Sequence, residues 1–103
     1  MPFASPYKRA SHFVLHGHEF GAADEYAYEQ MADAFMSQVM NPNLYECIRT
    51  VGAGDRVRLD GAIGYYGVAF ILTIRTFHTK SQQQIAAAGG PLALVTRKCS
   101  ERK

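Results

Sequence analysis

The first part of the chain carries apolar side chains at three- and four-residue steps, which is the spacing of an amphipathic helix. The pattern is clearest over residues 25–39. Asp24 is a suitable N-cap there, and Pro42 follows the end because proline cannot continue the helical hydrogen-bond ladder. A shorter helix is predicted over residues 8–16, with Gly17 as its terminator. We therefore expect two helices near the N-terminus.

A two-residue period replaces the helical spacing in the middle of the chain. Residues 44–51 and 56–59 are predicted strands separated by a glycine-rich turn. The aromatic and β-branched stretch 65–79 supplies two more strands, although no Gly or Pro marks the turn between them, so the register there is open. This order predicts an α+β fold in which two N-terminal helices pack on an antiparallel meander of three to five strands.

The last part of the chain differs in character from the rest. Residues 81–88 are compatible with a short polar helix, and residues 92–95 with a strand at the sheet edge. The charged residues 97–103 are expected to form a mobile tail. We therefore assign residues 1–80 to one domain and treat residues 81–103 as a partly ordered C-terminal extension.

Composition narrows the class of protein without naming a function. The chain has 103 residues, of which 48% are hydrophobic, and is long enough for one modest core. Eleven Lys and Arg against nine Asp and Glu leave a net charge of +2, which permits a local nucleic-acid-binding patch without requiring one. No apolar run is long enough to cross a membrane, and no secretory signal is visible, so we expect no membrane partner.

Cysteine use favours a reducing compartment. Cys47 and Cys99 lie far apart in the sequence and form no CxxC motif. We therefore expect no disulfide framework and interpret Cys47 as a small buried apolar side chain within a strand.

Histidines give the chain its candidate chemistry. His12, His16 and His18 lie close together beside Glu19, and His78 lies far downstream in a segment rich in cations and threonines. Histidine both accepts and donates a proton near neutral pH. An acid–base enzyme that acts on phosphate esters needs histidines together with cationic and hydroxyl-bearing side chains. The histidine cluster and the segment around His78 supply these two sets of groups.

Two other interpretations of the same residues stay open. His12 and His16 have the i, i+4 spacing that can bring two imidazoles to one metal ion, with His18, Glu19 or His78 completing the site. The motif lacks the glutamate of the zinc-hydrolase HExxH pattern. Alternatively, the domain is a non-enzymatic module that binds a partner protein through its open sheet edge.

Several short motifs resemble those of one group of bacterial toxins. They are His12-Phe-Val-Leu-His16-Gly-His-Glu19-Phe20-Gly21, Tyr26, Tyr28, Ala32, Phe35, Gly54-Asp55-Arg56-Val57-Arg58-Leu59-Asp60, Gly67-Val68 and Ile74-Arg75-Thr76-Phe77. The similarity is to ribonuclease toxin domains of the barnase/EndoU/colicin/RelE-like (BECR) fold, which occur in polymorphic and contact-dependent inhibition systems. It covers residues 12–80.

The resemblance implies a metal-independent endoribonuclease that needs no cofactor. Its expected substrate is RNA, with tRNA first, and its expected product is a 2′,3′-cyclic phosphate. The expected partner is a cognate immunity protein or antitoxin. Such a toxin acts in the bacterial cytoplasm, in some systems after delivery from another cell.

Site residues follow from joining this resemblance to the chemistry of RNA cleavage. The candidate catalytic residues are His16, His12, Arg75, Thr76 and His78. The candidate substrate-binding residues are Arg56, Arg58, Tyr66 and Lys80.

Each catalytic candidate has an expected role. His16 is the expected general base, and His12, one helical turn earlier, is the expected acid or a supporting group. Arg75 is expected to contact the phosphate and Thr76 to donate a hydrogen bond, with assistance from His78.

The substrate-binding candidates have roles along the RNA. Arg56 and Arg58 would extend positive charge along the RNA backbone. Tyr66 would stack on a base, and Lys80 would assist at the phosphate.

Overall fold

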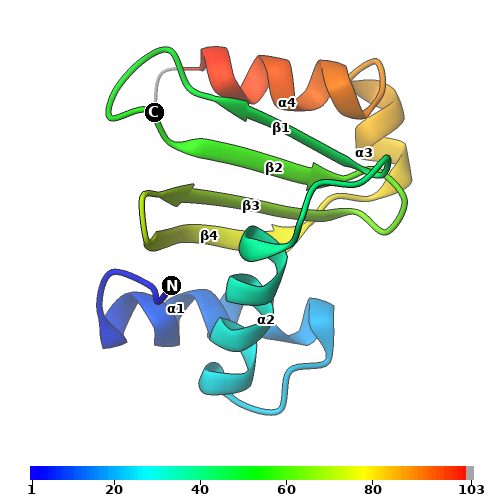
Figure 1. Ribbon diagram of the computed structural model, residues 1–103. Helices are drawn as coiled ribbons and strands as arrows, with labels where there is room; N and C mark the ends of the chain where they lie inside the picture. The colour runs from blue at the N-terminus through cyan, green and yellow to red at the C-terminus, as the bar shows by residue number, and fades with distance from the viewer. Residues whose placement is uncertain (102–103) are drawn as a thin grey trace.

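The computed structural model describes residues 1–101, which form four α-helices, one 3₁₀-helix and a four-stranded antiparallel sheet (Figure 1). The elements are α1 (Pro6–His16), η1 (Gly17–Phe20), α2 (Glu25–Ser37), β1 (Leu44–Ile48), β2 (Arg56–Asp60), β3 (Tyr65–Phe70), β4 (Thr73–Thr79), α3 (Gln82–Ala87) and α4 (Pro91–Ser100). The predicted α+β class, with two helices preceding a strand meander, is confirmed.

The N-terminal helices begin at side-chain caps. Ser5 accepts a hydrogen bond from the backbone N–H of Lys8 at the start of α1. Asp24 caps α2 by accepting from the backbone N–H of Ala27, as predicted. Gly17 does end α1, but the chain then turns through η1 rather than through an open loop. This extra turn keeps the histidine-rich segment compact.

The sheet has the simple order β1-β2-β3-β4. The turn between β3 and β4 includes Ile71 at φ +52°, a left-handed conformation that is disfavoured for a β-branched residue. This turn carries neither Gly nor Pro, which is why the sequence pattern did not locate it. Val68 pairs with Thr76 while Ala69 pairs with Ile74, so Arg75 is an extra residue in a β-bulge.

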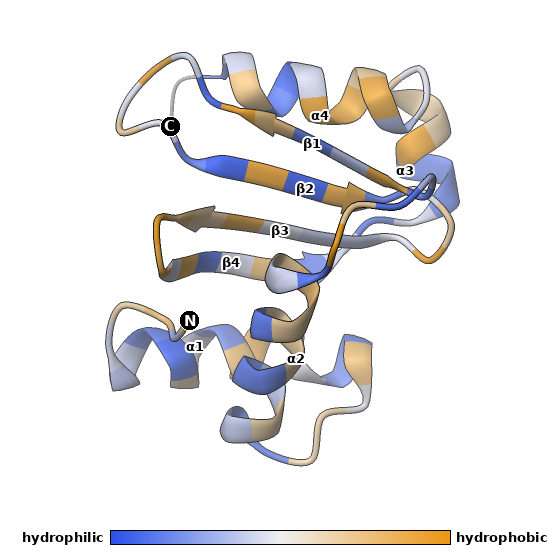
Figure 2. Ribbon diagram, viewed as in Figure 1, coloured by the Kyte–Doolittle hydropathy of each residue, from blue (hydrophilic) through white to orange (hydrophobic). Residues whose placement is uncertain are grey.

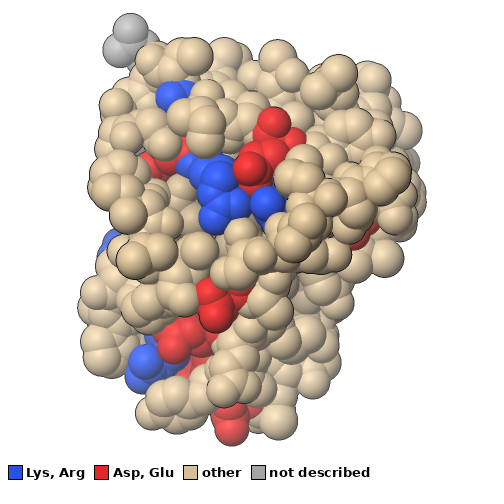
Figure 3. Space-filling view, in the orientation of Figure 1, with Lys and Arg blue, Asp and Glu red and all other residues tan. Residues whose placement is uncertain are grey.

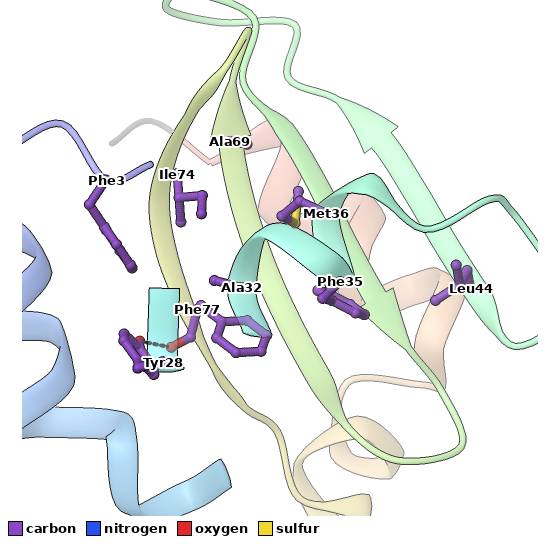
Figure 4. Close-up of a cluster of buried hydrophobic side chains, with 9 residues drawn as sticks. All are labelled: Phe3, Tyr28, Ala32, Phe35, Met36, Leu44, Ala69, Ile74 and Phe77. Atoms are coloured by element: carbon purple, nitrogen blue, oxygen red, sulfur yellow. Dashed lines mark hydrogen bonds between the residues drawn. The ribbon is translucent and has the colours of Figure 1, made fainter. Parts of the chain in front are cut away.

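Alternation along the strands divides the apolar side chains between the two faces of the sheet. On one face α2 lies across β3 and β4 and packs on Phe77, and the Tyr28 hydroxyl donates a hydrogen bond to the Phe77 carbonyl (Figure 4). Close approach of α2 needs Gly67, because a Cβ there would lie 2.6 Å from the Met36 sulfur. The buried residues of this first core are Phe3, Tyr28, Ala32, Phe35, Met36, Leu44, Ala69, Ile74 and Phe77.

A second core lies on the opposite face, beneath α4. Its buried residues are Val57, Leu59, Tyr66, Val68, Ile85, Leu94, Val95 and Cys99. The predicted edge strand at 92–95 is wrong, because these residues lie in α4, whose apolar positions are orange in Figure 2. Residues 97–100 of the predicted tail also belong to this helix, and 102–103 lie outside the described residues. The C-terminal segment therefore completes the core rather than extending it.

A disulfide joins Cys47 of β1 to Cys99 of α4, contrary to the prediction of free cysteines. The Cα atoms lie 6.4 Å apart, within the range that a disulfide spans. Packing of α4 on β1 and β2 creates this proximity, which the sequence separation conceals. The inference of a reducing compartment loses its support, because it depended on unpaired cysteines.

Within residues 1–101, none of the helices combines the length and the apolar character needed to cross a membrane.

Candidate active site

Two histidines from different elements meet beside the edge of the sheet. The first helix contacts the edge strand β4, and Figure 1 shows α1 running beneath that strand. The ring of His16, the last residue of α1, lies 5.0 Å from the ring of His78 on β4, measured between centroids. The predicted catalytic residues His16 and His78 are therefore brought together by the fold.

Glu19 links the two elements that carry these histidines. Its Oε2 atom lies 2.8 Å from Nδ1 of His16, and its Oε1 atom accepts hydrogen bonds from the backbone N–H and the hydroxyl of Thr79, at 2.7 and 2.9 Å. Burial opposes ionisation of Glu19, but the hydrogen bonds from His16 and Thr79 outweigh it and lower the pKa of this carboxyl. An ionised Glu19 accepts a hydrogen bond from the N–H group at Nδ1 of His16 and leaves the Nε2 atom of His16 available to the substrate.

The surroundings of His78 favour its neutral form. Its Nδ1 atom lies 3.2 Å from the carbonyl oxygen of Thr79. Because a carbonyl only accepts, this contact places the proton on Nδ1 and a lone pair on Nε2. Burial lowers the pKa of His78, with the charges of Lys80 and His16 adding to the effect and the Thr79 carbonyl partly opposing it. A neutral imidazole with a free Nε2 lone pair is suited to accept a proton.

Tyr66 and Lys80 extend the site along the same face of the sheet. The ring of Tyr66 lies 4.9 Å from that of His78, and the Nζ atom of Lys80 lies 4.9 Å above the Tyr66 ring. Burial raises the pKa of Tyr66 to about 12, so the phenol stays neutral. Burial and the nearby Lys98 on α4 lower the pKa of Lys80. Both residues were predicted from the sequence, and both lie beside the histidine pair.

His12 lies one step behind the pair. Its ring stacks on Phe3 at 5.1 Å and is 6.4 Å from the ring of His16. Within residues 1–101 its buried Nδ1 atom has no hydrogen-bond partner. Burial lowers the pKa of His12, and the positive charges of His16 and Lys8 lower it further. His12 therefore lies on the apolar side of His16 and is kept neutral there.

Arg75 and Thr76 precede His78 on β4 by three and two residues. Thr76 lies on the same face of β4 as His78, two residues before it. Arg75 is next to Thr76, in the bulge. Both line a hollow of about 610 Å³ that also includes Lys8 of α1. The Nε atom of Arg75 is 2.9 Å from Oδ2 of Asp55. The structure therefore pairs Arg75 with Asp55, and its contact with the scissile phosphate stays a prediction.

Arg56 and Arg58 are on the opposite face of the sheet. Both donate to Oε1 of Glu46, at 2.8 and 2.6 Å. Arg58 is only 4% exposed and also donates to the carbonyl oxygens of Phe35 and Gln38 at the end of α2. On the face seen in Figure 3, the central blue atoms adjoin red ones, as paired charges do. Arg58 is therefore too buried for its predicted contact with RNA and has a structural role, whereas Arg56 is paired with Glu46 and remains partly exposed.

Sequence reasoning missed two residues of the site. The sequence pattern indicates Glu19 only as a possible metal ligand. It indicates Thr76, rather than Thr79, as the threonine of the site. Glu19 lies three residues after His16, which is the spacing of neighbours on a helical surface. The sequence therefore contained a signal for the contact between Glu19 and His16. Thr79 could not be found without the contact between η1 and β4. His18 is exposed on η1.

Metal binding was the other chemistry considered for these histidines. In the described part of the chain, no group of three or more His, Cys, Asp or Glu side chains is arranged to hold a metal ion.

Comparison with protein-family models, curated proteins and solved structures finds no match for this chain.

Proposed function

We propose that this chain is a metal-independent endoribonuclease. The observation that carries the proposal is the approach of His16 and His78 to 5.0 Å between ring centroids, with Glu19 bonded to His16. Two positioned imidazoles can supply both the base and the acid that cleavage of an RNA phosphodiester requires. The resemblance of the histidine-rich segment to BECR-fold toxins supports the same activity.

The surroundings of each imidazole indicate its role. His78, with its lowered pKa and Nδ1 directed to Thr79, accepts the proton of the 2′-hydroxyl group. The 2′-oxygen then attacks phosphorus, and the bond from phosphorus to the 5′-oxygen breaks. His16, held by Glu19, gives a proton to the departing 5′-oxygen. The products are a 2′,3′-cyclic phosphate and a free 5′-hydroxyl. This proposal moves the role of base from His16, where the sequence interpretation had it, to His78.

Lys80 completes the charge requirement of the reaction. Its ammonium group lies over Tyr66, beside His78, where developing negative charge on the phosphoryl oxygens would be stabilised. Glu19 keeps His16 in place through the hydrogen bond to its Nδ1 atom, and His12 lies behind His16 at 6.4 Å between ring centroids.

The biological setting of the proposal depends on the resemblance. We infer that the chain is a bacterial toxin that acts on RNA, with tRNA as the first candidate. A cognate immunity protein or antitoxin is inferred to neutralise it. The likeness of the motifs supports this setting, and the site chemistry is compatible with it.

The test is incubation of the purified protein with total tRNA in the presence of EDTA. Cleavage that persists in the chelator, yields 2′,3′-cyclic phosphate ends and falls roughly 100-fold or more in both His16→Ala and His78→Ala would support the proposal. His18→Ala is the matched control, because this exposed histidine is outside the site. If the folded protein cleaves neither tRNA nor total cellular RNA, the proposal fails and a protein-binding module becomes the better account.

A further inference from the structure

The hollow beside Thr76 is lined by three cationic side chains that the acid–base chemistry does not use. They are Lys8 from α1, Arg49 from the segment after β1 and Arg75 from β4. Two carboxylates, Asp55 and Glu101, also line it, so cations remain in excess. A hollow of about 610 Å³ with this lining is suited to an anionic group.

Arg75 contacts its neighbours through one edge and one face of its guanidinium group, and its side chain is 46% exposed. Its Nε atom forms an ion pair with Oδ2 of Asp55 at 2.9 Å, and its guanidinium carbon lies 5.3 Å from the centroid of the Phe70 ring. Among the described residues, its two terminal nitrogens make no hydrogen bond. A guanidinium fixed at one edge and one face presents its remaining N–H groups as a fork for phosphate oxygens. The bulge at this position sets the direction of the side chain.

The other two cations differ in placement, since Arg49 is fixed by partners and Lys8 is exposed. Arg49 is tied to Asp55 at 3.4 Å and to the backbone carbonyl of Lys98 at 3.2 Å. Asp55, only 7% exposed, thus positions both arginines from beneath. Lys8 lies in the first turn of α1, where the helix dipole disfavours a cation and no acidic residue compensates. That end of α1 consequently carries a concentrated positive potential.

The hollow lies next to the histidine pair along β4. Thr76 and His78 share a face of the strand and are two residues apart, which corresponds to about 6.6 Å. This is the scale of one nucleotide step along an RNA backbone. A phosphate held at the histidines would therefore place its neighbour near Arg75.

We propose that Lys8, Arg49 and Arg75 form a subsite for a second backbone phosphate, adjacent to the one that is cleaved. The inference rests on the proposed ribonuclease function and specifies its substrate class: an RNA strand with a phosphate flanking the scissile one, rather than an isolated dinucleotide.

The test measures binding to the full chain, using probes that cannot be cleaved. The probes are deoxythymidine dinucleotides with no terminal phosphate, with a 5′-phosphate or with a 3′-phosphate, which lack the 2′-hydroxyl needed for reaction. One of the two terminal phosphates is expected to tighten binding by about tenfold. That gain should disappear in Arg75→Ala, shrink in Lys8→Ala and persist in Arg56→Gln, which removes the same charge from the opposite face.

The outcomes separate the subsite from the enzyme. No gain from either terminal phosphate, or an equal gain in the wild type and in folded Arg75→Ala and Lys8→Ala, would overturn the subsite even if tRNA is cleaved. A gain that depends on Arg75, in a protein that cleaves no RNA, would keep the phosphate site and remove the ribonuclease proposal.

Discussion

Glu19 accepts two hydrogen bonds from Thr79, through the backbone N–H at 2.7 Å and the hydroxyl at 2.9 Å. The same carboxylate bonds His16 through its other oxygen. One side chain thereby sets the distance between the end of α1 and the edge strand β4. This connection adds to the stacking of Phe20 of η1 on Phe77 of β4, at 4.0 Å between ring centroids, in placing the two histidines side by side.

Replacing Glu19 with Gln should lower cleavage of RNA by roughly 10- to 100-fold, because the group that orients His16 loses its charge while keeping its shape. The variant should also shift the pH profile of cleavage, which a purely structural role would not do. Glu25→Gln is a suitable control, since Glu25 pairs with Arg9 away from the histidine pair. An unchanged rate and pH profile in Glu19→Gln would contradict the positioning role.

Stability should fall as the pH drops below the usual histidine range. Burial lowers the pKa of both His12 and His78 below 6.5, the ordinary value for histidine, so the unfolded chain binds more protons than the folded one in this window. The stability that the neutral histidines contribute is present when the pH is above their pKa in the unfolded chain. It is lost as the pH falls through their lower pKa in the folded protein. Urea unfolding between about pH 7.5 and about pH 5.5 measures the loss.

The histidine variants assign this pH dependence. His78→Gln and His12→Gln should each flatten the slope of unfolding free energy against pH, whereas His18→Gln, at an exposed position, should leave it as in the wild type. A wild-type slope of zero across the window would show that neither buried histidine is held neutral.

Arg58 and Arg56 should differ sharply although both bond Glu46. Arg58→Met removes a buried guanidinium that donates to Glu46 and to two carbonyls at the end of α2, so the free energy of unfolding should fall by about 3 kcal/mol. Arg56→Gln removes a more exposed partner, and its effect should stay within about 1 kcal/mol. Urea denaturation at neutral pH tests both. Equal losses in the two variants would refute the structural role given to Arg58.

Reduction of the disulfide should weaken the folded state. The bond between Cys47 and Cys99 closes a loop with a sequence separation of 52, which corresponds to about 4 kcal/mol in the chain-entropy account. Thermal unfolding with and without dithiothreitol should show a lower Tm in the reductant. The double variant Cys47→Ala/Cys99→Ala should melt at one temperature in both conditions. A wild type with verified free thiols and an unchanged Tm would argue against the predicted contribution.

Much of the fold followed from local pattern. The three- and four-residue spacing located α2 and its cap at Asp24, and the two-residue period located β1 and β2. The sequence pattern predicts a strand at residues 92–95, where the structure has helix α4. Four apolar residues are too few to distinguish a strand from a buried helix.

The sequence by itself determined the candidate acid–base residues His16 and His78 and the candidate substrate-binding residues Tyr66 and Lys80. The structure brings these four together. Only the tertiary structure decided which side of the sheet each residue occupies. Side chains alternate along a strand, so a one-residue change in pairing moves a residue to the other face. The bulge at Arg75 is such a change. For the same reason Arg58 is buried beneath α2, and Thr79 rather than Thr76 meets Glu19.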